Sequence, residues 1–120
     1  MPGLYIHIPF CRAKCGYCDF ASAPGKPGEI DAFLEALARE ASAYAGLAGK
    51  FSTLYIGGGT PSLLSTEQLE KLFLIISDLT GPPQRLAEST FEANPESLGA
   101  EKAALLKKAA ISRISLGLQA

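Results

Sequence analysis

The stretch Leu4-Tyr5-Ile6-His7-Ile8, closed by Pro9, sets the pattern from which the fold is predicted. Successive side chains of a β-strand point to opposite faces, so the three aliphatic residues share one face while Tyr5 and His7 share the other. Proline cannot donate to a sheet ladder, and Pro9 is therefore a natural end for the strand. The pattern predicts a strand with one apolar face and one polar face.

Similar segments recur along the chain, and helical periodicity separates them. Apolar residues at helical spacing, together with alanines, favour a helix over residues 29–47. Further helices are predicted from Ser65 to Gly81 and near residues 99–109, and further strands at residues 52–56, 89–93 and 111–118. The order βαβαβαβ predicts an α/β fold with parallel βαβ units, about four strands and three helices.

The ends of two predicted helices carry local signals. Ser65 followed by Gln68 is a capping box, in which the two residues satisfy each other's free backbone N–H groups. Many helices end with a glycine in the left-handed conformation, whereas Ala110-Ile111 stands where that glycine is expected after the third helix. The sequence therefore predicts a capped second helix and a departure from the usual end of the third.

One face of the predicted sheet is polar, which suits a barrel lumen that holds a ligand. In the last strand Ile114, Leu116 and Leu118 oppose a polar set, which is Arg113, Ser115, Gly117 and Gln119. A flat sheet with helices on both sides would be apolar on both faces. Because a closed TIM barrel takes about 250 residues, the predicted βα units are too few to close one, and residues 1–120 are expected to be a fragment of a longer protein.

Special residues follow the strands at the edge where α/β folds bind ligands. They are a cysteine-bearing loop, the run Gly57-Gly58-Gly59, Glu92 with Asn94, and Gln119. The glycines are interpreted either as a flexible turn or as a place where a ligand approaches the backbone closely. Glu92, in mid-strand, is interpreted either as one half of an ion pair with Arg113 or as an acceptor for a ligand amine or hydroxyl.

The three cysteines of the chain, Cys11, Cys15 and Cys18, lie within eight residues. An odd number in so short a span is a poor disulfide framework, and clustered thiols indicate a metal or a cluster. Three thiolates on a four-iron cluster would leave one iron open, whereas ferredoxin-type clusters use four cysteines. The alternative is a zinc site with His7 as the fourth ligand. His7 is otherwise interpreted as a residue of the core or as a support for the metal ligands, and the simplest interpretation of Tyr5, Tyr17 and Tyr55 is that of core aromatic residues.

Composition excludes several classes of function. The chain has 120 residues, 48% of them hydrophobic and 19% charged, with a formal net charge of −1. This is a globular composition, and its charge balance argues against capture of nucleic acid or of acidic membranes. Its apolar runs are shorter than the roughly 18 residues that a membrane helix needs. Without a recognisable signal peptide, a cytoplasmic location is expected.

Five motifs in this order closely resemble the radical S-adenosylmethionine (radical SAM) enzymes of the oxygen-independent coproporphyrinogen III oxidase group. The first two are the strand at residues 4–8 that leads into Cys11 and the CxxxCxxC spacing of the three cysteines. The others are Gly-Gly-Gly-Thr-Pro at residues 57–61, Glu-Ala-Asn-Pro-Glu at 92–96 and Arg-Ile-Ser-Leu-Gly-Leu-Gln at 113–119. The resemblance spans residues 4–119 and implies that residues 1–120 are the truncated N-terminal portion of a radical SAM core, which is a partial TIM barrel followed by a C-terminal domain.

This resemblance implies a set of cofactors and site residues. Cys11, Cys15 and Cys18 would ligate three irons of a [4Fe–4S] cluster, and the fourth iron would bind the amine and carboxylate of S-adenosylmethionine. Electron transfer into the sulfonium would release a 5′-deoxyadenosyl radical. The positions that would contact S-adenosylmethionine are Tyr5, the backbone at Tyr17, Gly58, Gly59, Thr60, Glu92 and Gln119.

The resemblance also separates two branches of the group. Coproporphyrinogen oxidases carry a further cysteine soon after the third ligand, whereas Asp19-Phe20 follows Cys18 here. That favours the heme chaperone branch, which binds heme and hands it to acceptor proteins. The implied partners are heme or a porphyrin, an electron donor protein and heme-acceptor proteins. The alternatives are oxidative decarboxylation of coproporphyrinogen III and a zinc-stapled structural module.

Overall fold

A computed structural model describes residues 3–11, 23–24, 27–47, 49–81, 86–95 and 97–116 of the chain. Its centre is a sheet of four parallel strands in the order β1-β4-β5-β6. These strands are β1 (Gly3–Ile8), β4 (Thr53–Gly58), β5 (Glu88–Ala93) and β6 (Arg113–Leu116). The predicted parallel α/β architecture is confirmed, and the strand order places β1 and β6 at the two edges of the sheet.

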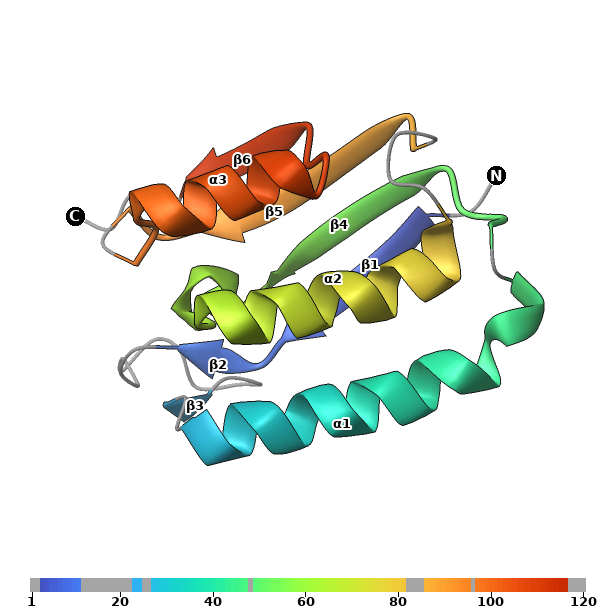
Figure 1. Ribbon diagram of the computed structural model, residues 1–120, viewed down its shortest axis with the longest axis horizontal. Coiled ribbons are helices and arrows are strands. Elements are labelled where there is room, and N and C mark those ends of the chain that lie inside the picture. Colours follow the sequence, from blue (N-terminus) through green and yellow to red (C-terminus); the bar gives the residue numbers. More distant parts are fainter. Residues whose placement is uncertain are drawn as a thin grey trace.

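Three helices cover one face of the sheet (Figure 1). They are α1 (Pro27–Ala43), α2 (Thr66–Thr80) and α3 (Ala100–Lys108), with α2 packed between the other two. The first helix ends sooner than residue 47, and a single 3₁₀ turn, η1 (Ala45–Leu47), follows it. A second 3₁₀ turn, η2 (Pro61–Leu63), leads from β4 into α2 and was not predicted.

The hydrophobic core lies between the sheet and this helical layer. Its centre on the sheet is a row of register partners, Ile6, Ile56 and Phe91, with exposed fractions of 5%, 0% and 0%. Side chains from all three helices close over the row, and those that are buried are Ile30, Leu34, Leu69, Leu72, Ile76 and Leu106. The aliphatic face predicted from strand alternation is therefore the face that packs against the helices in the core.

The two predicted helix ends both have a clear geometry. At the start of α2, Ser65 Oγ accepts a hydrogen bond from Gln68 N and Gln68 Oε1 accepts one from Ser65 N, which confirms the capping box. At the end of α3, Ile111 N donates to Leu106 O and Ala110 N donates to Lys107 O, which is a Schellman motif. Ala110 takes the left-handed position with φ of 61°, where a glycine would be unstrained.

A two-stranded parallel pair lies outside the main sheet and was not predicted. It joins β2 (Phe10–Cys11) to β3 (Ala23–Pro24). Such short strands carry no periodicity that a sequence pattern could reveal. The pair holds the backbone on the two sides of the cysteine-bearing segment side by side, which fixes where that segment leaves and re-enters the fold.

The second face of the sheet carries no helix among the described residues. Tyr5 and Tyr55 lie on it with exposed fractions of 52% and 39%, and His7 is exposed beside them. The interpretation of these three residues as core residues is wrong, because their strands bury the alternate, aliphatic residues instead. In the part of the chain that the structure describes, no helix is long and apolar enough to cross a membrane.

Candidate cofactor site at the C-terminal edge of the sheet

The glycine run after β4 is tied to the end of β1 by backbone hydrogen bonds. Gly59 N donates to Ile8 O at 2.7 Å, and Thr60 N donates to Phe10 O at 2.6 Å. Cys11 follows Phe10 directly in β2, so these bonds hold the first cysteine of the motif beside the glycine run. The C-terminal ends of neighbouring parallel strands thus meet here as predicted.

The protein's own atoms surround all three glycines closely, and at Gly58 and Gly59 those atoms belong to the backbone. A Cβ atom on Gly57 would lie 2.5 Å from Glu92 Oε1, and one on Gly58 would lie 2.7 Å from Ile8 O. Gly58 also has φ of 111°, which disfavours any residue with a Cβ. A Cβ on Gly59 would overlap the carbonyl group of Phe10. The run is therefore a close-packed junction of β1, β4 and β5, and the interpretation as a flexible turn is wrong.

Glu92 in β5 lies against this junction with both carboxylate oxygens engaged. Tyr55 Oη donates to Glu92 Oε2 at 2.6 Å, and Gly58 N donates to Glu92 Oε1 at 3.0 Å. The hydrogen bond to the Glu92 carboxylate, burial and the nearby negative charge together raise the pKa of Tyr55 above its usual value. The interaction therefore favours a protonated, donating phenol.

The predicted ion pair between Glu92 and Arg113 is absent, because Arg113 pairs with Glu88 instead. Arg113 is the register partner of Thr90, and Glu88 and Glu92 lie two residues before and after Thr90 along β5. Tyr55 and Gly58 already engage the Glu92 carboxylate. The ion-pair interpretation of Glu92 is therefore wrong as regards Arg113, and its interpretation as an acceptor for a ligand amine or hydroxyl stays a prediction.

Three aromatic rings stand beside Glu92 on the open face. Tyr5 and Tyr55 are register partners whose rings stack with centroids 5.8 Å apart and an interplanar angle of 16°. Tyr5 also stacks on His7 at 6.0 Å, and its hydroxyl lies 3.2 Å from His7 Nδ1. The stack joins β1 to β4 and carries a row of polar groups along the open face toward the C-terminal edge.

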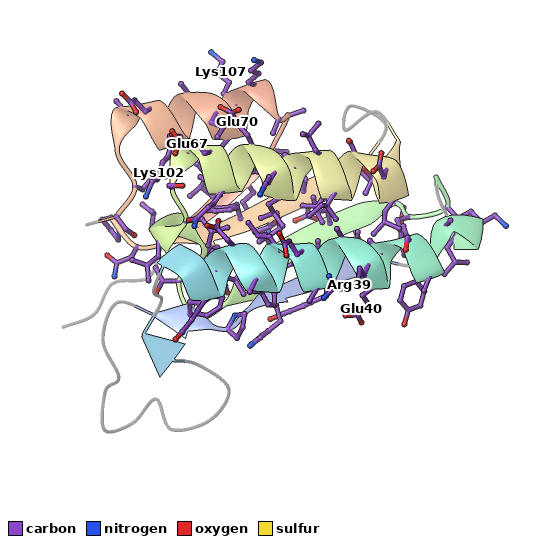
Figure 2. All side chains as sticks on the ribbon, turned by 60° about the horizontal axis from the view of Figure 1, so that its bottom comes forward. Arg39, Glu40, Glu67, Glu70, Lys102 and Lys107 are labelled. Carbon is purple, nitrogen blue, oxygen red and sulfur yellow. The ribbon has the colours of Figure 1, made fainter. Side chains whose placement is uncertain are left out.

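A second group of polar contacts fixes the loop that follows β5. Asn94 N donates to Ser62 Oγ at 2.9 Å, and Ser62 Oγ lies 2.5 Å from Ser97 Oγ. Lys102 Nζ donates to Ser62 O at 2.6 Å and to Ser97 O at 3.1 Å, and in Figure 2 Lys102 lies where α3 meets the segment leading into α2. Burial lowers the pKa of Lys102. These contacts join η2 to the end of β5.

A cleft of about 180 Å³ opens between these two loops. Its wall is formed by residues at or just beyond the C-terminal ends of β4, β5 and β6, namely Gly59, Thr60, Pro61, Glu92, Ala93, Asn94 and Ser115. Pockets for small molecules usually measure about 300–1,000 Å³. The cleft is therefore large enough for one polar portion of a cofactor, and a whole cofactor would extend beyond it over the open face.

The structure brings together most of the predicted contact residues that it describes. Gly59, Thr60 and Glu92 line the cleft, Gly58 donates to Glu92, and Tyr5 stacks on Tyr55, which also binds Glu92. Cys11 is placed by its backbone alone. The remaining predicted residues, Cys15, Tyr17, Cys18 and Gln119, lie outside the described part of the chain.

Sequence reasoning missed Tyr55, Ser62 and Lys102. Tyr55 occupies the same alternating position in its strand as Tyr5, so strand parity alone could have placed it on the open face. Nothing in the local sequence marks Ser62 or Lys102, because the contacts that tie Ser62 to Asn94 and to Lys102 join residues 32 and 40 positions apart in the chain. Both residues act through contacts that exist only after the loops are assembled.

Comparison with known proteins agrees with the fold. The sequence model of the family described as "Radical SAM superfamily" matches residues 5–120. The chain therefore belongs to the radical SAM superfamily.

Individual proteins are similar to the chain over almost its whole length. The chain is 43% identical over 99% of its length to "Heme chaperone HemW" of Bacillus subtilis and 45% identical over 96% to the protein of that name from Lactococcus lactis. It spans 32% and 30% of those two proteins. A solved structure of the coproporphyrinogen III oxidase HemN from Escherichia coli, described as a radical SAM enzyme, matches 98% of the chain with a TM-score of 0.86 at 30% identity. The chain covers 28% of that structure.

Proposed function

We propose that this protein holds a [4Fe–4S] cluster and S-adenosylmethionine at the C-terminal edge of its sheet and acts as a heme chaperone. Cys11, Cys15 and Cys18 would hold the cluster. The residues that would contact S-adenosylmethionine are Tyr5, Tyr17, Gly58, Gly59, Thr60, Glu92 and Gln119. The family membership over residues 5–120 supports both cofactors.

The chemistry of the described residues fits such a cofactor pair. Glu92 offers a carboxylate at the cleft for an amine, and its position beside Gly58 is fixed by hydrogen bonds before any ligand enters. The β1–β4 junction holds the backbone of Cys11 next to the same cleft. When bound, the cluster and S-adenosylmethionine would together supply radical chemistry. The residues of this chain would bind and orient them.

The chaperone assignment is carried by one observation, the 40–45% identity to several proteins named heme chaperone over nearly the whole chain. The cysteine pattern supports it, because the 120 residues contain no cysteine after Cys18. Heme would be the bound ligand, and acceptor proteins and an electron donor would be the partners. A reducing compartment would keep these cysteines as thiols, so the proposed location is the cytoplasm.

The second candidate is oxidative decarboxylation of coproporphyrinogen III. The match to the coproporphyrinogen III oxidase structure favours it, since the backbones agree with a TM-score of 0.86. The lower identity of that match, 30% against 43% for the Bacillus subtilis chaperone, makes it the weaker candidate.

The protein spans about a third of the length of these relatives. We propose that residues 1–120 are the N-terminal portion of a radical SAM core and supply the first four strands of a partial barrel. In such a protein the further barrel strands and a C-terminal domain would complete the heme site.

The decisive experiment offers both ligands to the longer protein that contains this segment. After anaerobic reconstitution with iron and sulfide, it is incubated separately with heme and with coproporphyrinogen III. We expect a stable heme complex, seen as a shifted Soret band, and no decarboxylated product by mass spectrometry. A Cys18→Ser variant controls for the cluster. Decarboxylation without stable heme binding would overturn the chaperone assignment in favour of the oxidase.

A further inference from the structure

We propose that Tyr55 is a positioning residue for Glu92, which holds the carboxylate in the orientation that receives the amine of S-adenosylmethionine. The inference rests on the proposed function and adds to it a residue outside the set expected to contact the cofactor. Tyr55 would act through Glu92, so its hydroxyl need not touch the ligand.

The argument begins with the two hydrogen bonds on Glu92. A carboxylate offers about four lone-pair positions on its two oxygens. Tyr55 Oη uses one on Oε2 at 2.6 Å, and Gly58 N uses one on Oε1 at 3.0 Å. Each oxygen therefore keeps acceptor capacity, and Glu92 lines the cleft at which a ligand would use it.

The strand register explains why Tyr55 is suited to this task. Tyr55 pairs with Thr90 across β4 and β5, and Glu92 lies two residues further along on the same face. A tyrosine ring is long enough to span such a diagonal pair. Tyr5 stacks on the Tyr55 ring from β1 at a centroid distance of 5.8 Å, which limits the freedom of the ring on that side.

Without the phenol, the described structure offers Glu92 one fixed donor, the Gly58 amide. Arg113, the cation nearest in register, is engaged by Glu88. The side chain would then be free to turn about the remaining hydrogen bond, and binding a ligand would have to order it again. Loss of such preorganisation weakens binding even where every ligand contact can still form.

The hydrogen bond to Glu92 is the main cause that raises the pKa of Tyr55, so a titration of this tyrosine is a second way to test the contact. A tyrosine that donates to a carboxylate keeps its proton at higher pH than one in water, whose pKa is about 10. The stabilisation from this contact is full below that pH and is lost as pH rises through the raised pKa of the folded state. Absorbance at 295 nm can follow the titration in protein without cofactors.

The test measures the dissociation constant of S-adenosylmethionine on the reconstituted protein by equilibrium dialysis. We expect Tyr55→Phe to weaken binding about three- to tenfold, since hydrogen bonds to charged groups are among the stronger ones. Cluster content by iron and sulfide analysis should not change. Tyr44→Phe is the matched control, because Tyr44 is an exposed tyrosine near the end of α1, and its dissociation constant should equal that of the wild type.

A double-mutant cycle with Glu92→Gln separates positioning from a direct contact. In that background the amide offers one neutral oxygen in place of two charged ones, so Tyr55→Phe should change binding by less than about twofold. Glu92→Gln should also lower the late tyrosine titration toward the ordinary pKa, as Tyr55→Phe should abolish it.

The outcomes distinguish this inference from the proposed function. If the wild-type protein binds no S-adenosylmethionine, the proposed function fails. If the wild type binds it and Glu92→Gln weakens binding, while Tyr55→Phe binds as the wild type does, the proposed function stands and the positioning role is refuted. Equal effects of Tyr55→Phe in both backgrounds would also refute it. If either Tyr55→Phe or Glu92→Gln fails to fold, the tyrosine titration of the variant that folds, compared with the wild type, still decides whether Tyr55 and Glu92 are in contact.

Discussion

The two faces of the sheet are built from alternate residues of the same strands, yet they serve different purposes. On one face Ile56 and Phe91 are fully buried beneath the helices. On the other face Tyr55 and Glu92, their immediate neighbours in sequence, remain accessible and bind each other. A shift of one residue in either strand would exchange these roles. The comparison teaches that the covered face stabilises the fold, which leaves the open face available for binding.

The largest expected effect falls on the covered face. Phe91→Ala should lower the free energy of unfolding by about 3–5 kcal/mol, because a fully buried ring at the centre of the core is lost. Leu74→Ala is the control, since Leu74 on α2 is 68% exposed and its truncation should cost less than about 0.5 kcal/mol. Urea denaturation followed by circular dichroism measures both. Similar costs for the two variants would contradict the division between the faces.

The next largest effect is expected at the glycine run, the junction of β1, β4 and β5. Gly59→Ala should cost about 1–3 kcal/mol of unfolding free energy, since its Cβ would press on the backbone of Phe10 rather than on a movable side chain. The displacement should also lower iron loading, because Cys11 follows Phe10. Gly28→Ala in α1 meets nothing within 4 Å and should stabilise slightly. If Gly59→Ala melts and loads iron as the wild type does, the close-packed junction is not needed.

One position in the helical layer should gain stability when it is changed. Ala110 adopts a left-handed φ of 61° at the end of α3, a conformation that costs a residue with a Cβ about 1–2 kcal/mol. Ala110→Gly removes that strain but adds freedom to the unfolded chain, so we expect a net gain of about 0.5–1 kcal/mol. Differential scanning calorimetry should show a higher Tm. A lower Tm would show that the left-handed turn is not strained.

The smallest effect is expected at the edge of the open face. Glu88 and Arg113 form an ion pair whose side chains are 43% and 63% exposed. Exposed pairs contribute only about 0–1 kcal/mol and are screened by salt. A double-mutant cycle with Glu88→Gln and Arg113→Gln should therefore give a coupling energy in that range that falls as NaCl is added. A coupling above about 2 kcal/mol, insensitive to salt, would contradict this view of the pair.

Most of the fold followed from the sequence because local patterns determine it. Alternation in residues 4–8 identified β1 and its two faces, and Ser65 with Gln68 marked the start of α2. The order of strands and helices then determined a parallel sheet with its C-terminal ends at one edge. Each of these inferences uses residues within a few positions of one another.

The wrong predictions concern contacts between strands that are neighbours in the sheet but far apart in the sequence. The expected ion pair of Glu92 with Arg113 depended on how β6 aligns with β5. In the structure Arg113 lies opposite Thr90. Alternation correctly placed Ile114 and Leu116 on the side of Phe91 and Ala93, yet they are 39% and 53% exposed because β6 is an edge strand. The partnership of Tyr55 with Glu92 depends on register in the same way, and no local pattern could have predicted it.

The central claim is that the C-terminal edge of the open face holds an iron–sulfur cluster and S-adenosylmethionine together. It is tested most directly by electron paramagnetic resonance of the anaerobically reconstituted and reduced protein, recorded with and without S-adenosylmethionine. We expect the signal of a reduced four-iron cluster, and we expect its g values to change when S-adenosylmethionine is added. A tightly bound zinc ion in place of the cluster, or a cluster signal that S-adenosylmethionine leaves unchanged, would contradict the account.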